Sequence, residues 1–148
     1  MSRKTETLAD YPHHLVIPTR WMDNDVYGHV NNVVYYSWFD TVVNRYLIDE
    51  GVLDIASSPV IGLVVATNCA YFASVAFPDA IVAGLRVAHL GNSSVRYEIG
   101  LFREGAETPA AAGEFTHVYV DRATNRPVPL PAPLRAKLEA IFVAPKSE

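Results

Sequence analysis

The sequence lacks the features that mark secreted, membrane-spanning and nucleic-acid-binding proteins. Its 148 residues include one cysteine, Cys69, so no intramolecular disulfide can form, which fits a reducing compartment. No window approaches the run of about eighteen uninterrupted apolar residues that a membrane-spanning helix needs. The net charge of −4 argues against a non-specific nucleic-acid surface, which requires a basic face. We therefore expect a cytoplasmic protein without a nucleic-acid or membrane partner.

Metal-ligand spacing is also missing. A stretch that opens with Asp23 and Asp25 could suggest a calcium loop, but its fifth and twelfth positions would be Tyr27 and Val34, which are not ligands. Cys69 has no histidine at motif spacing, so we expect it in the core or on a sheet face. We predict no metal site from the histidines, which are His13, His14, His29, His89 and His117.

The sequence does contain enough apolar material for one domain. Hydrophobic residues make up 50% of the chain and aromatic residues 11%, which suffices to build a core. The polar composition of residues 1–12 predicts a flexible N-terminal arm. Residues 13–148 are predicted to form a single domain.

One long helix is predicted from Asn32 to Asp49, because no glycine or proline interrupts this stretch. Apolar residues occupy most of its circumference, which is typical of a buried helix. Gly51 is suited to cap its C-terminus, and a second, short helix is predicted over residues 132–142. The polar residues of the long helix fall at helical spacing in one narrow strip, formed by Ser37, Asp40, Thr41 and Asn44.

β-like runs lie on both sides of this helix in the sequence. The first, residues 14–20, precedes the helix, and Pro18 predicts a sheet edge or a strand end. The later runs are separated by turn signals, and one of them alternates with period two. This order predicts an α+β domain, in which an antiparallel sheet of about five strands curls around one long helix. The later runs are residues 61–71, 80–90, 94–102 and 110–120.

The stretch from Trp21 to Asn32 carries the candidate chemistry. Asp25 lies three residues before Gly28, which permits a turn with positive φ. Asn31 and Asn32 are both good helix N-caps, so a loop and a turn should lead into the long helix. Such an order aims backbone N–H groups and the positive end of the helix dipole at one spot. A carboxylate beside preorganised oxyanion donors suits acyl transfer, although the same residue types also serve solvated loops and caps.

The pattern Asp23-x-Asp25-x-x-Gly28-His29-Val30-Asn31-Asn32-x-x-Tyr35 resembles the active-site segment of hotdog-fold acyl-CoA thioesterases of the 4-hydroxybenzoyl-CoA thioesterase type. The Gly-His-Val-Asn-Asn form resembles the branch of small bacterial acyl-CoA thioesterases. The resemblance implies a hotdog fold, with a sheet wrapped around a central helix. It also implies hydrolysis of an acyl-CoA to free acid and CoA by a homodimer or homotetramer. No cofactor is expected, because coenzyme A is part of the substrate.

On this resemblance, Asp25 matches the catalytic aspartate of the family, which acts as general base or nucleophile. The backbone N–H of Asn32 would polarise the thioester carbonyl, and Gly28 would keep the turn open. Asp23 is expected to support the loop, while Asp40, a carboxylate within an apolar helix, is the reserve catalytic candidate. The residues expected to contact the substrate are Tyr27, His29, Tyr35, Thr67, Asn68, Ser93 and Ser94.

One departure from the family concerns the CoA phosphates. A well-known member that acts on an aromatic substrate carries a basic cluster where Gly91-Asn92-Ser93 stands here. If that cluster holds the nucleotide phosphates, this protein must use other residues. The available arginines are Arg86, Arg96, Arg103, Arg122 and Arg126.

Two other functions stay open. A hotdog protein could bind acyl-CoA or acyl carrier protein without hydrolysing it, although the presence of Asp25 argues against this. A hotdog dehydratase or hydratase resembles a different pattern, in which an Asp/His pair moves protons, and that spacing is not found here.

Overall fold

The structure, a computed structural model, describes residues 3–144. Its two single-turn 3-10 helices, η1 (Leu8–Asp10) and η2 (Trp21–Asp23), precede β1 and α1 respectively. The succession of strand, helix, consecutive strands and terminal helix confirms the predicted α+β class. The other elements are β1 (His13–Pro18), α1 (Asn32–Asp49), β2 (Val60–Tyr71), β3 (Ala80–Leu90), β4 (Ser94–Arg103), β5 (Ala111–Asp121) and α2 (Ala132–Glu139).

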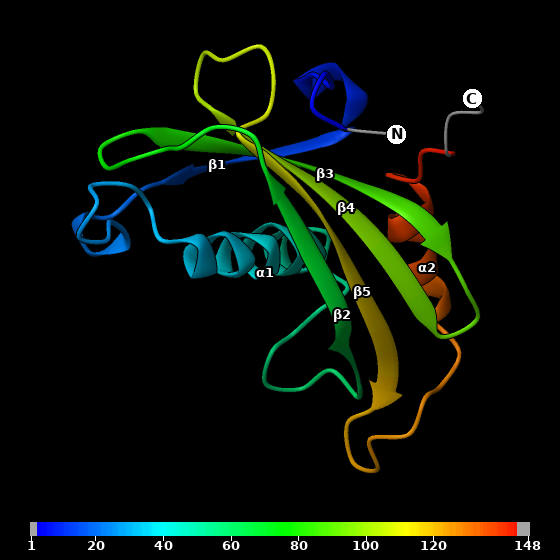
Figure 1. The fold of residues 1–148 in the computed structure, drawn as a ribbon. Coiled ribbons are helices and arrows are strands. Elements are labelled where there is room, and N and C mark those ends of the chain that lie inside the picture. The colour runs from blue at the N-terminus through cyan, green and yellow to red at the C-terminus, as the bar shows by residue number, and fades with distance from the viewer. Residues whose placement is uncertain (1–2, 145–148) are drawn as a thin grey trace.

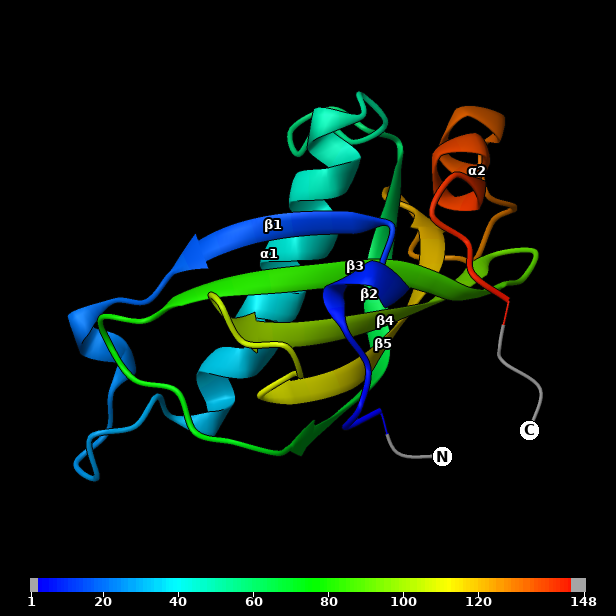
Figure 2. The ribbon, with the colours of Figure 1, turned by 90° about the horizontal axis from the view of Figure 1, so that it is seen from above.

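The five strands form one antiparallel sheet in the order β1-β3-β4-β5-β2. The sheet curls around α1, which crosses one of its faces (Figure 1; Figure 2). We call this the inner face and the opposite one the outer face. The arrangement confirms the predicted hotdog fold. Pro18 ends the edge strand β1 opposite Ala80, so the missing N–H of the proline costs the sheet no central hydrogen bond.

The inner face and α1 together form the core. On β4 the predicted alternation is confirmed, because Val95, Tyr97, Ile99 and Leu101 are all buried. Phe39 of α1 lies directly under β5, where a Cβ at Gly113 would be 2.5 Å from its ring. The absence of a side chain at Gly113 therefore lets the helix approach the sheet closely.

α1 buries only part of its circumference within one chain. Its inward side chains are buried, whereas the predicted polar residues Ser37, Asp40 and Thr41 are exposed. The apolar residues Val33 and Ile48 are exposed as well. The covered side consists of Tyr35, Trp38, Phe39, Val42, Val43, Tyr46 and Leu47.

A small polar cluster interrupts the core beneath β4 and β5. The hydroxyls of Tyr97 and Tyr119 lie 2.6 Å apart and share a hydrogen bond. His117 is 3% exposed, and neither of its ring nitrogens has a partner among the described residues. Burial lowers the pKa of His117 to about 4, so the ring is neutral at neutral pH. Gly62 of β2 gives the ring space, since a Cβ there would lie 2.8 Å from Nδ1 of His117.

The edge strand β2 is the least covered strand of the sheet. It pairs with β5 on one side only, and its register shifts between Val64 and Ala66. Leu63, Val64 and Val65 are exposed along it. An exposed edge with apolar side chains is a ready template for pairing with another chain.

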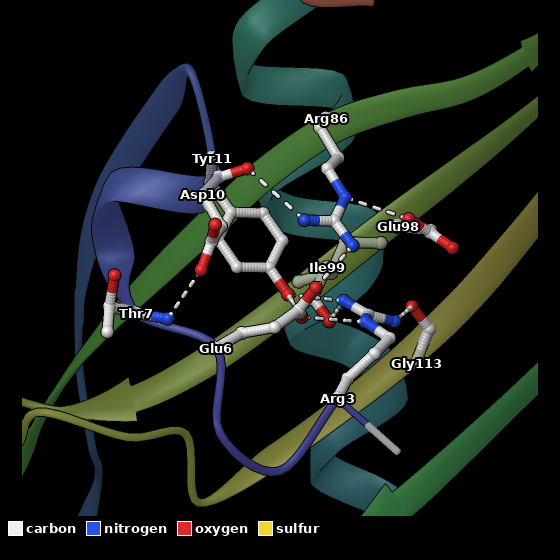
Figure 3. A network of polar contacts seen from close by, with 9 residues as sticks. All are labelled: Arg3, Glu6, Thr7, Asp10, Tyr11, Arg86, Glu98, Ile99 and Gly113. Atoms are coloured by element: carbon white, nitrogen blue, oxygen red, sulfur yellow. Dashed lines mark hydrogen bonds and ion pairs between the residues drawn. The ribbon is translucent and has the colours of Figure 1, made fainter. Parts of the chain in front are cut away.

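Residues 3–11 cross the outer face of the sheet, on the side opposite α1 (Figure 3). The sequence predicted a flexible arm for residues 1–12, of which Met1 and Ser2 lie outside the described residues. In the structure the ring of Tyr11 is buried against the sheet, where a Cβ at Gly84 or Gly100 would lie 2.7 Å from it. Arg3 donates to the carbonyl oxygens of Ile99 at 2.9 Å and Gly113 at 2.8 Å.

Ion pairs complete this attachment. Glu6 accepts hydrogen bonds from Arg3, from the Tyr11 hydroxyl and from Arg86 at 2.9, 2.6 and 2.6 Å. Arg86 also donates to Glu98 at 2.8 Å, and its guanidinium lies 4.6 Å from the centre of the Tyr11 ring. We call these five side chains, Arg3, Glu6, Tyr11, Arg86 and Glu98, the N-terminal clasp (Figure 3).

The terminal helix α2 ends earlier than the sequence predicted. Residues 132–142 were expected to be helical, but α2 stops at Glu139. The reason is that the following backbone bonds to β3, with Val87 donating to Ile141 and accepting from Val143. At the other side of α2, the Tyr46 hydroxyl donates to the carbonyl of Lys137 at 2.6 Å and ties α2 to α1. Within residues 3–144 no helix is long and apolar enough to cross a membrane.

Candidate active site

Asp23 supports the loop before α1, as expected. Asp23 is only 2% exposed, and its carboxylate accepts the Arg20 backbone N–H at 2.7 Å and the Arg20 guanidinium at 2.8 and 3.0 Å. Its carbonyl oxygen accepts the N–H of Asn31 at 2.9 Å. Asp23 therefore closes the 3-10 turn at η2 and holds the residue that begins the helix, and it is not open to a substrate.

Asp25 lies in a tight loop that folds back on itself. Its N–H donates to the carbonyl of His29 at 2.8 Å, and its own carbonyl accepts the N–H of Gly28 at 3.0 Å. Gly28 has φ of 77°, the left-handed conformation expected from the sequence. One carboxylate oxygen of Asp25 accepts the N–H of Tyr27 at 2.9 Å. The loop thus fixes the carboxylate while leaving it half-buried at the surface.

The helix start presents an unused donor beside this loop. The Asn31 side chain caps α1 by accepting the N–H of Val33 at 3.0 Å, and the Asn31 carbonyl accepts the N–H of Val34 at 3.0 Å. The N–H of Asn32 donates to no acceptor in the part of the chain that the structure describes. Asn32 is exposed, so this N–H is available at the positive end of the helix dipole.

The segment that follows β2 holds the loop and the helix start in place. The N–H of Val30 donates to the carbonyl of Val75 at 2.9 Å, and Asn24 accepts the N–H of Phe77 at 3.0 Å. At the end of β2, the hydroxyl of Tyr71 donates to the carbonyl of Asn32 at 3.2 Å. Sequence reasoning missed these contacts, because they join residues 39 to 53 positions apart and no motif marks them.

The predicted substrate contacts fall into two groups. Tyr27, 82% exposed, and the exposed His29 belong to the loop of Asp25 itself. Tyr35 is buried one turn into α1, where its ring packs against that of Tyr71 at 5.0 Å between centroids. Tyr27, His29 and Tyr35 thus surround the start of α1.

The other predicted contacts lie on β2 and at the turn between β3 and β4. Thr67 and Asn68 stand on the exposed part of β2 and bond to Glu114, at 3.1 and 3.4 Å. Ser93 and Ser94 lie at the turn between β3 and β4, at the end of the sheet away from the Asp25 loop (Figure 1). One chain does not bring those serines to the carboxylate.

The reserve candidate Asp40 lies on the exposed strip of α1, more than two turns beyond Asn32. Desolvation raises the pKa of its carboxyl, although no hydrogen bond to the carboxylate is found among residues 3–144. No backbone donor is aimed at this position, because the N–H groups here are bonded within the helix. Asp40 therefore has a perturbed carboxyl but lacks the oxyanion donor that accompanies Asp25.

The structure separates the arginines that could meet CoA phosphates. Arg86 is engaged in the N-terminal clasp, and Arg122 donates to the carbonyls of Ser58 and Ile55 at 2.8 and 2.7 Å. Arg103 and Arg126 are exposed and Arg96 is half-buried. Those three remain the freer candidates. No group of three or more metal-ligating side chains occurs within residues 3–144.

The sequence matches the model of one protein family. The family model described as the thioesterase-like superfamily matches residues 19–138. A solved protein of Pseudomonas aeruginosa strain PAO1 shares 57% identity over 92% of this chain and 95% of its own, with a TM-score of 0.90. A second Pseudomonas aeruginosa protein, described provisionally as a thioesterase, shares 30% identity over 85% of this chain and 97% of its own, with a TM-score of 0.80.

More distant structures share the fold. The 1,4-dihydroxy-2-naphthoyl-CoA thioesterase of Synechocystis is 15% identical, with a TM-score of 0.77 over 84% of this chain and 93% of its own. Among curated proteins, the comparison finds no match.

Proposed function

This chain belongs to the thioesterase-like superfamily, and on that premise we propose that it hydrolyses acyl-CoA thioesters to the free acid and CoA. The observation that carries the proposal is the unused N–H of Asn32 at the helix start, next to the loop that fixes Asp25. A thioesterase needs a carboxylate to activate water or attack the acyl carbon, and a donor for the oxyanion that develops. The Asp25 loop and the start of α1 supply one of each.

The reaction follows from these two groups. Asp25 takes a proton from water as the oxygen attacks the thioester carbon, or attacks that carbon itself to form an anhydride that water then opens. In either route the carbonyl oxygen becomes negative and accepts the N–H of Asn32, and CoA leaves as the thiolate. Loss of one such donor costs about 3 kcal/mol of barrier in other hydrolases.

A second copy of the chain completes the proposed site. The exposed edge of β2 invites pairing between copies, and a homodimer or a homotetramer built from such dimers would cover Leu63, Val64 and Val65. In that assembly Ser93 and Ser94 would come from a different copy than Asp25, while Tyr27, His29, Thr67 and Asn68 line the entrance. The proposal includes a cytoplasmic location and no cofactor beyond the CoA of the substrate.

The test is CoA-thiol release from a panel of aliphatic and aromatic acyl-CoAs, measured for wild type, Asp25→Asn and Asp40→Asn. We expect a substrate-dependent wild-type rate that falls on the order of 10²–10³-fold in Asp25→Asn, since the substitution keeps the size of the side chain but removes its charge. Asp40→Asn should retain wild-type kcat, because no oxyanion donor accompanies that carboxylate.

Two results would contradict the proposal. Equal rates for wild type and Asp25→Asn would remove the carboxylate from the chemistry. Tight binding of acyl-CoA without release of thiol by wild type would favour a carrier or sensor over a hydrolase.

A further inference from the structure

The first peptide group of α1, between Asn32 and Val33, is held at both of its polar ends. Its N–H donates to the Asn31 side chain at 3.0 Å. Its carbonyl oxygen accepts the hydroxyl of Tyr71, which reaches it from the end of β2 at 3.2 Å. Asn31 is in turn fixed through its N–H, which donates to the carbonyl of the buried Asp23 at 2.9 Å. Asn32 supplies the carbonyl of this peptide group. Its own N–H, in the preceding peptide group, donates to no acceptor among residues 3–144.

We infer that Tyr71 is a positioning residue, which orients the first turn of α1 so that the N–H of Asn32 meets the developing oxyanion. This inference rests on the proposed thioesterase function and adds to it a group from a different strand. Tyr71 does not touch the reacting atoms in this account. It acts through the carbonyl of Asn32.

Tyr71 is 44% exposed, and one side of its ring packs against the core. Its ring meets that of Tyr35 edge to face, and Tyr35 packs on Trp38 with 5.1 Å between ring centroids. Both of those side chains are buried. Tyr71 also pairs with Ala111 in the sheet, so its backbone moves with β2 and β5. The hydroxyl therefore connects a rigid sheet to the helix end.

The hydroxyl is neutral at neutral pH and can donate. Desolvation, with the neighbouring Cys69 as the next contribution, raises the pKa of Tyr71 far above its ordinary value. An ionised tyrosine could not donate to a carbonyl, whereas the neutral hydroxyl does so without titrating.

The chemical consequence concerns the transition state. Helix ends fray because their terminal groups lack partners, and a frayed first turn would present the Asn32 N–H in a range of directions. A hydrogen bond from this N–H stabilises the neutral carbonyl of the bound substrate only weakly, but it stabilises the oxyanion of the transition state strongly. Loosening the turn should therefore lower kcat and leave KM nearly unchanged.

The experiment compares two substitutions that each remove one hydroxyl bonded to a backbone carbonyl. Tyr71→Phe removes the anchor at the start of α1, and Tyr46→Phe removes the bond to Lys137 near its other end. With the best acyl-CoA substrate, we expect kcat to fall roughly 10-fold in Tyr71→Phe at unchanged KM, in line with the sensitivity of catalysis to small misplacements. Tyr46→Phe should lower the thermal midpoint and leave kcat as in wild type.

The outcomes separate this inference from the proposed function. If wild type turns over and Asp25→Asn does not, but Tyr71→Phe equals wild type, the positioning role is wrong and the thioesterase proposal stands. A rise in KM at constant kcat would instead place Tyr71 in substrate binding, which also overturns the inference. Activity that is unaffected in Asp25→Asn would refute the proposed function itself.

Discussion

The two faces of the sheet are covered by different kinds of contact. On the inner face, α1 buries apolar side chains such as Phe39 and Val42 against the strands. On the outer face, residues 3–11 are fastened by arginine and glutamate pairs around the ring of Tyr11 (Figure 3). Both coverings exclude water from the middle of the sheet. The two sets of contacts differ in how strongly their contribution to stability depends on pH.

The difference lies in the dependence on charge. Apolar burial is proportional to area and insensitive to protonation. Partly buried ion pairs depend on the charge of every member and weaken when one member is neutralised. On the inner face, His117 departs from this rule: it is buried and neutral, and its ring nitrogens have no hydrogen-bond partner among residues 3–144. The comparison therefore predicts large, pH-independent losses from the inner core, a pH-dependent loss at His117, and smaller losses at the clasp.

The largest effect is expected for Phe39→Ala. Phe39 is fully buried, against Gly113 and the ring of Phe115, so its removal leaves a cavity that the sheet cannot fill. The free energy of unfolding, measured by urea denaturation, should fall by about 3–5 kcal/mol. Val33→Ala, at an exposed position of the same helix, should change it by less than about 0.5 kcal/mol. Similar losses in the two variants would mean that α1 is not the core helix.

An intermediate effect, visible only in acid, is expected for His117→Phe. The pKa of His117 is about 4 when folded against an ordinary 6.5, so the unfolded chain takes up a proton first as the pH falls. Stability is thus complete above pH 6.5 and is lost on the way to pH 4, by roughly 3 kcal/mol. The Phe variant cannot be protonated and should keep that increment, because an apolar ring also suits the pocket.

The measurement is the free energy of unfolding of wild type and His117→Phe between pH 4 and 7. The titratable groups that face His117 are Tyr97 and Tyr119, which stay neutral in this range because burial raises the pKa of each. All other titrations are common to both proteins and cancel in the difference. Parallel curves would show that His117 is already protonated or solvated when folded.

The smallest effect is expected for Glu6→Gln in the N-terminal clasp. Burial would raise the pKa of Glu6, but hydrogen bonds from Tyr11, Arg86 and Arg3 outweigh it and keep the pKa below its usual value. The charged carboxylate thus adds stability above its ordinary pKa, and this contribution is lost as the pH falls through the lower folded value. At neutral pH the substitution should cost about 1–2 kcal/mol, since it leaves two arginines short of a counter-charge.

Asp49→Asn is the matched control for the clasp. It removes an exposed pair with Arg45, which should contribute less than about 0.5 kcal/mol. Urea denaturation at neutral pH, with hydrogen exchange of the amides of residues 3–11, measures both variants. Equal stability of Glu6→Gln and wild type would mean that the arm is flexible in solution, as the sequence predicted.

Local patterns predicted the elements well. The span of α1, the period-two alternation on β4 and the turn at Gly28 all follow from residues close together in sequence, and the structure has them as predicted. The long-range contacts could not be predicted in this way. Arg3 meets Gly113 across 110 positions, and Tyr71 meets Asn32 across 39. Neither pairing leaves a periodic or compositional signal.

The candidate site was also predictable only in part, because its local motif can be read from the sequence but its tertiary contacts cannot. Asp23 and Asp25 look alike in the sequence. In the structure the carboxylate of Asp23 is bonded to the guanidinium of Arg20, whereas the carboxylate of Asp25 accepts one backbone N–H, from Tyr27. The chain fold decides that difference. The catalytic role of Asp25 stays a prediction until its substitution is measured.

The packing of the Tyr11 ring against Gly84 and Gly100 limits where the chain can be shortened or tagged. The family model matches from residue 19 only, so its boundary would suggest removing the preceding residues for recombinant expression. A chain that began at residue 19 would lack β1 and most of the N-terminal clasp. It would also expose Gly84 and Gly100 on the outer face, where the Tyr11 ring packs. Affinity tags at this end should therefore be joined through a spacer ahead of Arg3, and trimming should stop before it.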